Sequence, residues 1–176
     1  MWGQTMSPRT GIVEASELSR AFDRSFAELP RRDTTVRHDF LAVKIGGDPY
    51  AVRISEIAGL YADKKITPVP ARITTLLGIA AFRGVIVPVH DLRTLFGYAS
   101  TGAPRWLVVT AQLPVALAFD GFAGHLRLSG DAMSGYSGRH ATHGYVSGVV
   151  REHDHAWPIV DMAASLEAIG RAVQGV

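Results

Sequence analysis

The chain has 176 residues, of which 47% are hydrophobic and 19% are charged. Lys and Arg number 18 and Asp and Glu number 16, a net charge of +2, too small and too scattered to indicate nucleic-acid binding. No cysteine is present, which excludes disulfides, thiolate metal sites and cysteine nucleophiles.

The length predicts one domain or a compact pair of small lobes. No apolar run approaches the roughly 20 residues of a membrane helix, and the N-terminus lacks the basic-then-apolar pattern of a signal peptide. We therefore expect a cytoplasmic protein with no direct membrane insertion.

Residues 1–36 differ in pattern from the rest of the chain and are predicted to form an N-terminal extension. The segment 16–29 carries apolar side chains at helical spacing, and Pro30 ends the pattern. The apolar positions are Leu18, Phe22, Phe26 and Leu29. This amphipathic helix either packs on the body of the protein or docks to a partner or a second copy.

A hairpin is predicted next, with strands at 40–45 and 50–54 around the turn residues 46–49. Residues 55–59 are expected to form a single helical turn or a bend that Gly59 ends. The following segment, 64–70, is predicted to be extended because it contains two prolines.

The stretch 76–97 has the clearest local pattern in the chain. Residues 76–82 read as a buried strand, Arg83-Gly84 as a tight turn, and the β-branched residues 85–87 as the returning strand. Asp91 is predicted to cap a short helix that ends at Gly97.

The second half of the chain contains further short strands and one longer helix. Residues 129–144 are rich in glycine and serine and predict an exposed loop. The strands are predicted at 105–111, 115–120, 122–128, 145–151 and 156–160, and the helix at 162–173. Many short strands with few helices are typical of small antiparallel barrels.

A pattern in the central stretch recurs seventy residues later. Gly78 and Pro88 lie ten residues apart and are followed by Asp91; Gly148 and Pro158 have the same spacing and are followed by Asp161. The matched spacing favours an internal repeat over chance and predicts two similar substructures.

No group of residues assembles a catalytic or metal site. The histidine pairs His140/His143 and His153/His155 lie in polar loop or turn segments, whereas zinc requires three or four converging ligands. No nucleophile motif or phosphate-binding glycine loop occurs, so we expect no enzyme activity, metal or cofactor.

The remaining candidate site residues are charges at bends. Glu56 and Arg83 each follow a strand, and they are either partner-binding residues or ordinary solvated charges.

The stretch from Phe40 to Arg93 resembles the CheW-like family, the coupling proteins of bacterial chemotaxis arrays. The similarity is strongest in 66–70 and in Arg-Gly-Val-Ile-Val-Pro-Val-His-Asp-Leu-Arg, residues 83–93, and it continues more weakly to about Ile169. Two features depart from the family pattern: Ala81 replaces the usual asparagine, and the N-terminal helix is additional.

The resemblance implies a mostly β fold of two packed five-stranded SH3-like barrels, with short helices, the extra N-terminal helix and a C-terminal helix. The barrels would form the two lobes of one domain, residues 37–176. Family members are non-catalytic scaffolds that bridge the cytoplasmic tip of a methyl-accepting chemoreceptor and the regulatory domain of a CheA-type histidine kinase.

By matching positions, the resemblance implies partner-binding residues on two bends and one strand. Ile54 and Glu56 would lie on the receptor-side bend, Arg83 and Gly84 on a turn at the groove between barrels, and Gly78 in the strand beneath. An alternative function is an interaction module in a gliding-motility or other non-chemotactic two-component signalling complex, recruited through the N-terminal helix.

Overall fold

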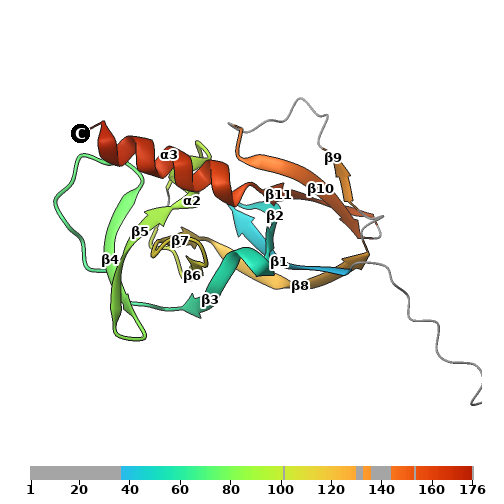
Figure 1. Ribbon diagram of the computed structural model, residues 1–176, viewed down its shortest axis with the longest axis horizontal. Helices are drawn as coiled ribbons and strands as arrows, with labels where there is room; N and C mark the ends of the chain where they lie inside the picture. The colour runs from blue at the N-terminus through green and yellow to red at the C-terminus, as the bar shows by residue number, and fades with distance from the viewer. Residues whose placement is uncertain (1–36, 101, 130–132, 136–143, 153, 176) are drawn as a thin grey trace, which may run out of the picture. The chain divides into compact units, whose positions relative to one another are not determined.

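A computed structural model describes residues 37–100, 102–129, 133–135, 144–152 and 154–175. The predicted N-terminal helix and the histidines His140, His143 and His153 lie outside these residues. Within the described part, strands dominate, as predicted (Figure 1). In chain order the elements are β1 (Arg37–Ile45), β2 (Asp48–Arg53), the 3-10 helix η1 (Ile54–Glu56), β3 (Ile57–Ala62), β4 (Leu76–Phe82), β5 (Val85–Asp91), α2 (Leu92–Leu95), β6 (Trp106–Thr110), β7 (Ala116–Phe119), β8 (Gly121–Ser129), β9 (Met133–Gly135), β10 (Val146–Glu152), β11 (His155–Val160) and α3 (Met162–Gln174).

The segment after the first hairpin differs from the prediction. A single helical turn does form, as η1, but Gly59 does not end it, because β3 begins at Ile57 and contains Gly59. β3 pairs with β6, where Gly59 lies opposite Val109. That long-range pairing compensates for the low strand propensity of glycine and alanine, so local pattern alone misses this strand.

The strands form two sheets. Sheet A has the order β8-β1-β2-β11-β10-β9 and sheet B the order β3-β6-β7-β5-β4. The prediction of five strands holds for sheet B, but sheet A has six, because the three-residue strand β9 pairs with β10 along one edge. Closure of either sheet into a barrel stays a prediction.

Each sheet combines strands from both halves of the chain. In sheet B, β3 pairs with β6 and β5 lies parallel to β7. In sheet A, β8 pairs with β1 and β11 lies parallel to β2. The first two strands of each half therefore join the last strands of the other half, and we call this arrangement the strand exchange.

The internal repeat appears in the structure as two equivalent hairpins. Gly78 lies opposite Val89 in β4–β5, and Gly148 lies opposite Ile159 in β10–β11, each next to a shift in strand register. The aspartates that follow cap the helices: the Asp91 carboxylate accepts a hydrogen bond from the Arg93 amide and that of Asp161 from the Ala164 amide. The matched spacing in the sequence therefore reflects matched structure.

Three apolar clusters hold the two sheets. One lies within sheet A and includes Phe40 and Ile159. Another lies within sheet B and includes Phe82 and Val89. The third and largest combines residues from both sheets with α2 and α3, and thus joins the two sheets. In Figure 1, α3 runs from the sheet A strands toward those of sheet B. The members of this third cluster are Leu41, Val43, Ile45, Tyr50, Val52, Leu92, Phe96, Val108, Leu117, Phe119, Val160, Met162, Leu166 and Ile169.

Candidate functional site

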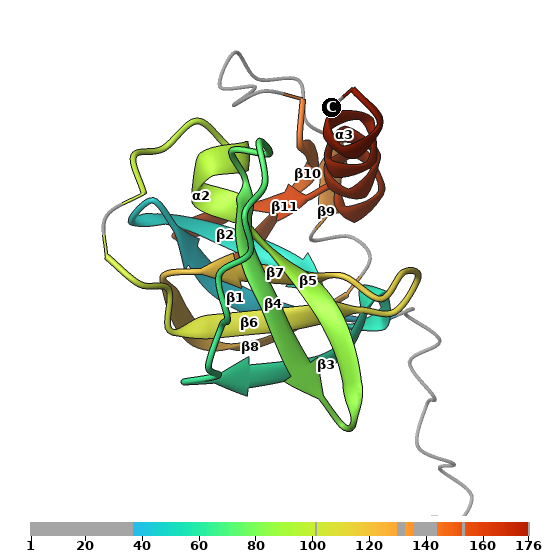
Figure 2. The same cartoon turned by 90° about the vertical axis from the view of Figure 1, so that its left-hand side faces the viewer.

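The turn between β4 and β5 presents Arg83 and Gly84 to solvent. Both have positive φ, 47° and 82°, as the two central residues of a type I′ hairpin turn require. The next two residues are also exposed, Val85 by 56% and Ile86 by 68%. Figure 2 shows this hairpin projecting away from α2 and α3. The turn therefore carries a cation beside an apolar surface.

Gly78 lies in β4, the strand that leads into this turn, and is buried. Its φ is +145°, and a Cβ there would overlap the carbonyl oxygen of Thr67. Thr67 forms two backbone hydrogen bonds with Ile79, at 2.8 and 2.9 Å. The absence of a side chain at Gly78 thus allows the segment before β4 to lie against the strand.

Ile54 and Glu56 both lie in η1, and both are half-buried. Ile54 packs against the cluster that joins the two sheets. The side chain of Glu56 is 23% exposed, and its Oε1 lies 3.8 Å from Arg53 Nη1. Its Oε2 is buried and accepts no hydrogen bond from the residues that the structure describes.

The surroundings of Glu56 disfavour its charge. Burial raises the pKa of this carboxyl above its usual value; Arg53 opposes that effect, and the nearby Asp161 carboxylate adds to it. A carboxylate in such a position is most stable when a cation or an N–H group reaches its free oxygen.

The structure does not join the two charges that sequence reasoning singled out. Over the described ranges, the only cation within 4 Å of the Glu56 carboxylate is that of Arg53, and Arg83 makes no ion pair. The two residues therefore act as separate groups.

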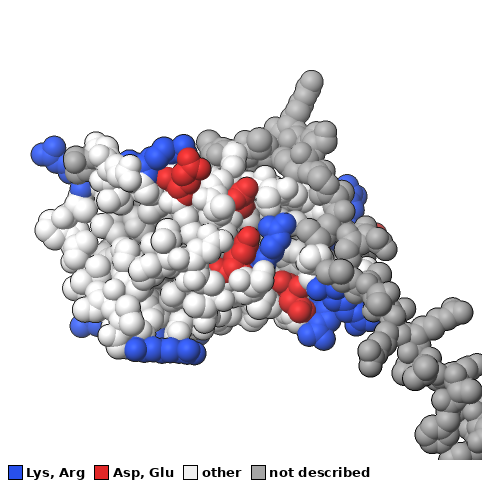
Figure 3. Space-filling view, in the orientation of Figure 1, with Lys and Arg blue, Asp and Glu red and all other residues white. Residues whose placement is uncertain are grey.

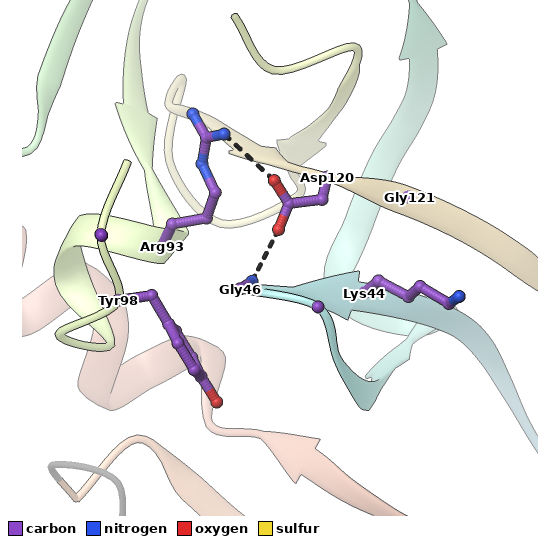
Figure 4. A pocket seen from close by; sticks show the side chains of 8 residues that line it. Lys44, Gly46, Arg93, Tyr98, Asp120 and Gly121 are labelled. Atoms are coloured by element: carbon purple, nitrogen blue, oxygen red, sulfur yellow. Dashed lines mark hydrogen bonds and ion pairs between the residues drawn. The ribbon is translucent and has the colours of Figure 1, made fainter. Parts of the chain in front are cut away.

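Sequence reasoning missed a buried charge network around the second arginine of the motif. Arg93 is 2% exposed, and its Nε and Nη2 donate to both oxygens of Asp91 at 2.9–3.2 Å. Its Nη1 donates to Asp120 at 3.0 Å, and the other Asp120 oxygen accepts from the Gly46 amide at 2.6 Å (Figure 4). The spacing of Asp91 and Arg93 was visible, but the role of Asp120 depends on the fold.

This network ties α2 to the turn between β1 and β2. Tyr98 packs where a side chain of Gly46 would lie, and its hydroxyl donates to Asp48 at 2.6 Å. An open pocket of about 500 Å³ lies beside it, lined by Lys44, Gly46, Gly47, Arg93, Tyr98, Ala99, Asp120 and Gly121. Because Asp120 is already paired through both oxygens, the arrangement serves as a structural tie.

Two further features of the described residues concern metal binding and membrane insertion. No group of three or more His, Cys, Asp or Glu side chains in them is arranged to hold a metal ion. Of the helices in this part of the chain, none is long and apolar enough to span a membrane. Figure 3 shows a broad uncharged area over the sheet B strands on the left of this face, whereas acidic and basic side chains lie across its middle and right.

Comparisons with known proteins define the class. The family model for the CheW-like domain matches residues 39–170, and the chain belongs to this family. The crystal structure of the scaffolding protein TtCheW from Thermoanaerobacter tengcongensis is similar, with a TM-score of 0.65 and 18% identity. That match covers 71% of this chain and 89% of the other and shows the same fold. No curated protein matches. The resemblance read from the sequence is thus confirmed.

Proposed function

We propose that this protein is a non-catalytic cytoplasmic adaptor that couples the tips of methyl-accepting chemoreceptors to a CheA-type histidine kinase. The observation that carries the proposal is the family match over residues 39–170, because members of this family act as scaffolds in chemotaxis signalling. The proposal needs neither a metal nor a cofactor.

The geometry of the two bends supports partner binding at Ile54, Glu56, Arg83 and Gly84. The buried Oε2 of Glu56 accepts no hydrogen bond from the described residues, so a donor from a partner would stabilise it. Arg83 is exposed beside the apolar residues that follow it, a combination that suits a contact with an apolar centre and a charged rim. Gly78 would contribute indirectly, by allowing the segment around Thr67 to lie against β4.

The experiment measures binding of the full chain to a chemoreceptor tip and to the regulatory domain of a CheA-type kinase, by calorimetry at physiological salt. We expect Glu56→Lys to cost about 2–5 kcal/mol, as for a desolvated charge that loses its partner. Arg83→Glu should cost less and depend on salt, as for a rim charge. Because the two residues do not pair with each other, the losses should add in the double variant.

Lys44→Glu is the matched control, because it reverses an exposed charge on β1 that belongs to neither bend. Full affinity in both single variants would remove the two bends from the interface. If wild-type protein binds neither partner, the adaptor function fails as a whole, and the non-chemotactic module becomes the better description.

A further inference from the structure

One edge of sheet B is only partly covered. β4 is the last strand in the order β3-β6-β7-β5-β4. Thr67 pairs with Ile79 as an isolated antiparallel bridge, which covers the middle of this edge. Two residues further along β4, Ala81 forms no backbone hydrogen bond to any described segment beyond its hairpin.

The register fixes where the backbone groups of Ala81 point. Opposite residues in antiparallel strands alternate between hydrogen-bonded and non-hydrogen-bonded pairs. The backbone N–H and C=O of Ile79 are both hydrogen-bonded to Thr67. Ile79 lies opposite Pro88, which has no N–H, so Ile79 and Pro88 form a non-hydrogen-bonded pair. Ala81 lies opposite Ile86, two positions further along the strand, and therefore also belongs to a non-hydrogen-bonded pair. Its N–H and C=O point outward from the sheet edge.

A groove lies at this position. Its volume is about 440 Å³, and its lining combines the edge of β4 with the segment that follows β3. If the bridge at Thr67 continued as a strand, Lys65 would lie opposite Ala81; instead the chain diverges and leaves the groove open. Ile86, at 68% exposure, forms its apolar side. The lining residues are Lys64, Lys65, Thr67, Ile79, Ala80, Ala81 and Ile86.

The charge of the groove is positive. Lys64 and Lys65 are exposed and form no ion pair with other described residues. The ammonium of Lys64 lies over the rings of Tyr61 and Phe82, at 5.5 and 5.7 Å from their centroids. The adjacent Asp63 is engaged by Arg105 at 3.1 Å. In Figure 3 basic side chains lie along the edge below β3 and the β4–β5 hairpin, with no acidic ones beside them.

We propose that this groove binds an extended acidic segment of a partner protein, which adds a short strand to β4 at Ala81. The segment would form backbone hydrogen bonds with Ala81, place an apolar side chain on Ile86, and direct carboxylates to Lys64 and Lys65. A second copy of the chain would bring its own lysines to the groove, so charge disfavours that occupant. The inference does not rest on the proposed function, because it requires only that the partner segment is extended and acidic, and the partner need not be a chemoreceptor.

The test uses the full chain and a fluorescein-labelled, end-capped peptide, Ser-Glu-Val-Glu-Ile-Glu-Ser, with Lys replacing each Glu in a second peptide. We expect the acidic peptide to bind at least tenfold more tightly than the basic one and to slow amide hydrogen exchange at Ala81. A third peptide, with N-methyl groups along one edge, should lose this binding, because it cannot form the ladder.

Two protein variants complete the design. Ala81→Pro removes only an outward N–H, as edge strands tolerate, and should weaken peptide binding at least tenfold with the thermal midpoint retained. Lys64→Glu with Lys65→Glu should reverse the preference between the acidic and basic peptides, whereas Lys44→Glu should leave it unchanged.

Unchanged exchange at Ala81 with saturating acidic peptide would overturn the inference. Equal binding of the N-methylated and the unmodified acidic peptides to the wild-type chain would also overturn it. That comparison does not depend on the folding of any protein variant. Salt-sensitive binding without protection of Ala81 would mean adhesion to the lysines alone and would also reject strand addition. Binding of the Ala81→Pro variant to a chemoreceptor tip is measured in parallel. That measurement distinguishes a failure of strand addition at Ala81 from a failure of the adaptor function.

Discussion

Glu56 illustrates, at the scale of one residue, how a position that we propose for partner binding departs from what stability favours. The carboxylate lies among partly buried groups with one oxygen unpartnered among the described residues and a second carboxylate, Asp161, close enough to raise its pKa. Arg93 shows the opposite case, because its guanidinium is satisfied by Asp91, Asp120 and Ser100.

We predict that Glu56→Gln stabilises the free protein at neutral pH. Burial raises the pKa of Glu56 in the folded state, so the unfolded chain releases this proton at lower pH than the folded chain does. The free energy of unfolding therefore decreases as the pH rises from the usual value of 4.5 through the raised one. Urea midpoints of the variant and the wild type should differ at pH 7 and converge near about pH 4.

Glu167→Gln is the control for this prediction, because that carboxylate is 68% exposed and its removal should leave the midpoint nearly unchanged. A Glu56→Gln protein that is less stable than wild type at pH 7 would show that the contact with Arg53 outweighs the burial of the charge.

At the scale of elements, the β4–β5 hairpin combines a demanding turn with a partly open edge. Arg83 and Gly84 both adopt positive φ, and only the second position is occupied by the residue that accepts this conformation without strain. The turn thereby fixes the hairpin register that points Ala81 outward and places Ile86 beside it.

We predict that Gly84→Val destabilises the protein by about 1–3 kcal/mol, because a β-branched residue is strained at positive φ. Space is not the cause, since a Cβ at Gly84 would meet nothing within 4 Å. Gly84→Asn is the matched variant and should cost much less, because asparagine tolerates this region. Equal denaturant midpoints for Gly84→Val and wild type would contradict the strained turn.

The elements that sequence predicts well are those whose signals are local. The turn at Arg83-Gly84, the cap at Asp91 and the C-terminal helix follow from adjacent residues, and the structure contains all three. β3 is defined by a partner far along the chain, β6, and the three-residue strand β9 by its pairing with β10, so the residues of neither segment reveal it on their own. Of the candidate site, the exposed turn was predictable, but the half-buried state of Glu56 depends on packing against distant residues.

At the scale of the whole molecule, the strand exchange makes each sheet depend on both halves of the chain. The first strands of each half complete the sheet of the other half, and the largest apolar cluster draws on both. Neither half contains a complete sheet, so we expect partial unfolding of one sheet to disrupt the other.

We predict that a chain beginning at residue 37 unfolds in one cooperative thermal transition. Every described strand of both sheets begins at or after that position, and the exchange couples the two sheets. Calorimetric and van't Hoff enthalpies of unfolding should therefore agree. Two separate transitions would contradict the coupling, and the absence of any transition would show that residues 1–36 complete the core.

The strand exchange also gives the molecule the form of a dimer fused end to end. Apart from the additional strand β9 in the second half, each half, β1 to α2 and β6 to α3, has the same series of two strands, a crossing strand, a glycine-bearing hairpin and a capped helix. A half-length ancestor with this series would complete its sheets only by pairing with an identical copy. A backbone cut in the connection between α2 and β6 should therefore yield two fragments that fold only by recombining.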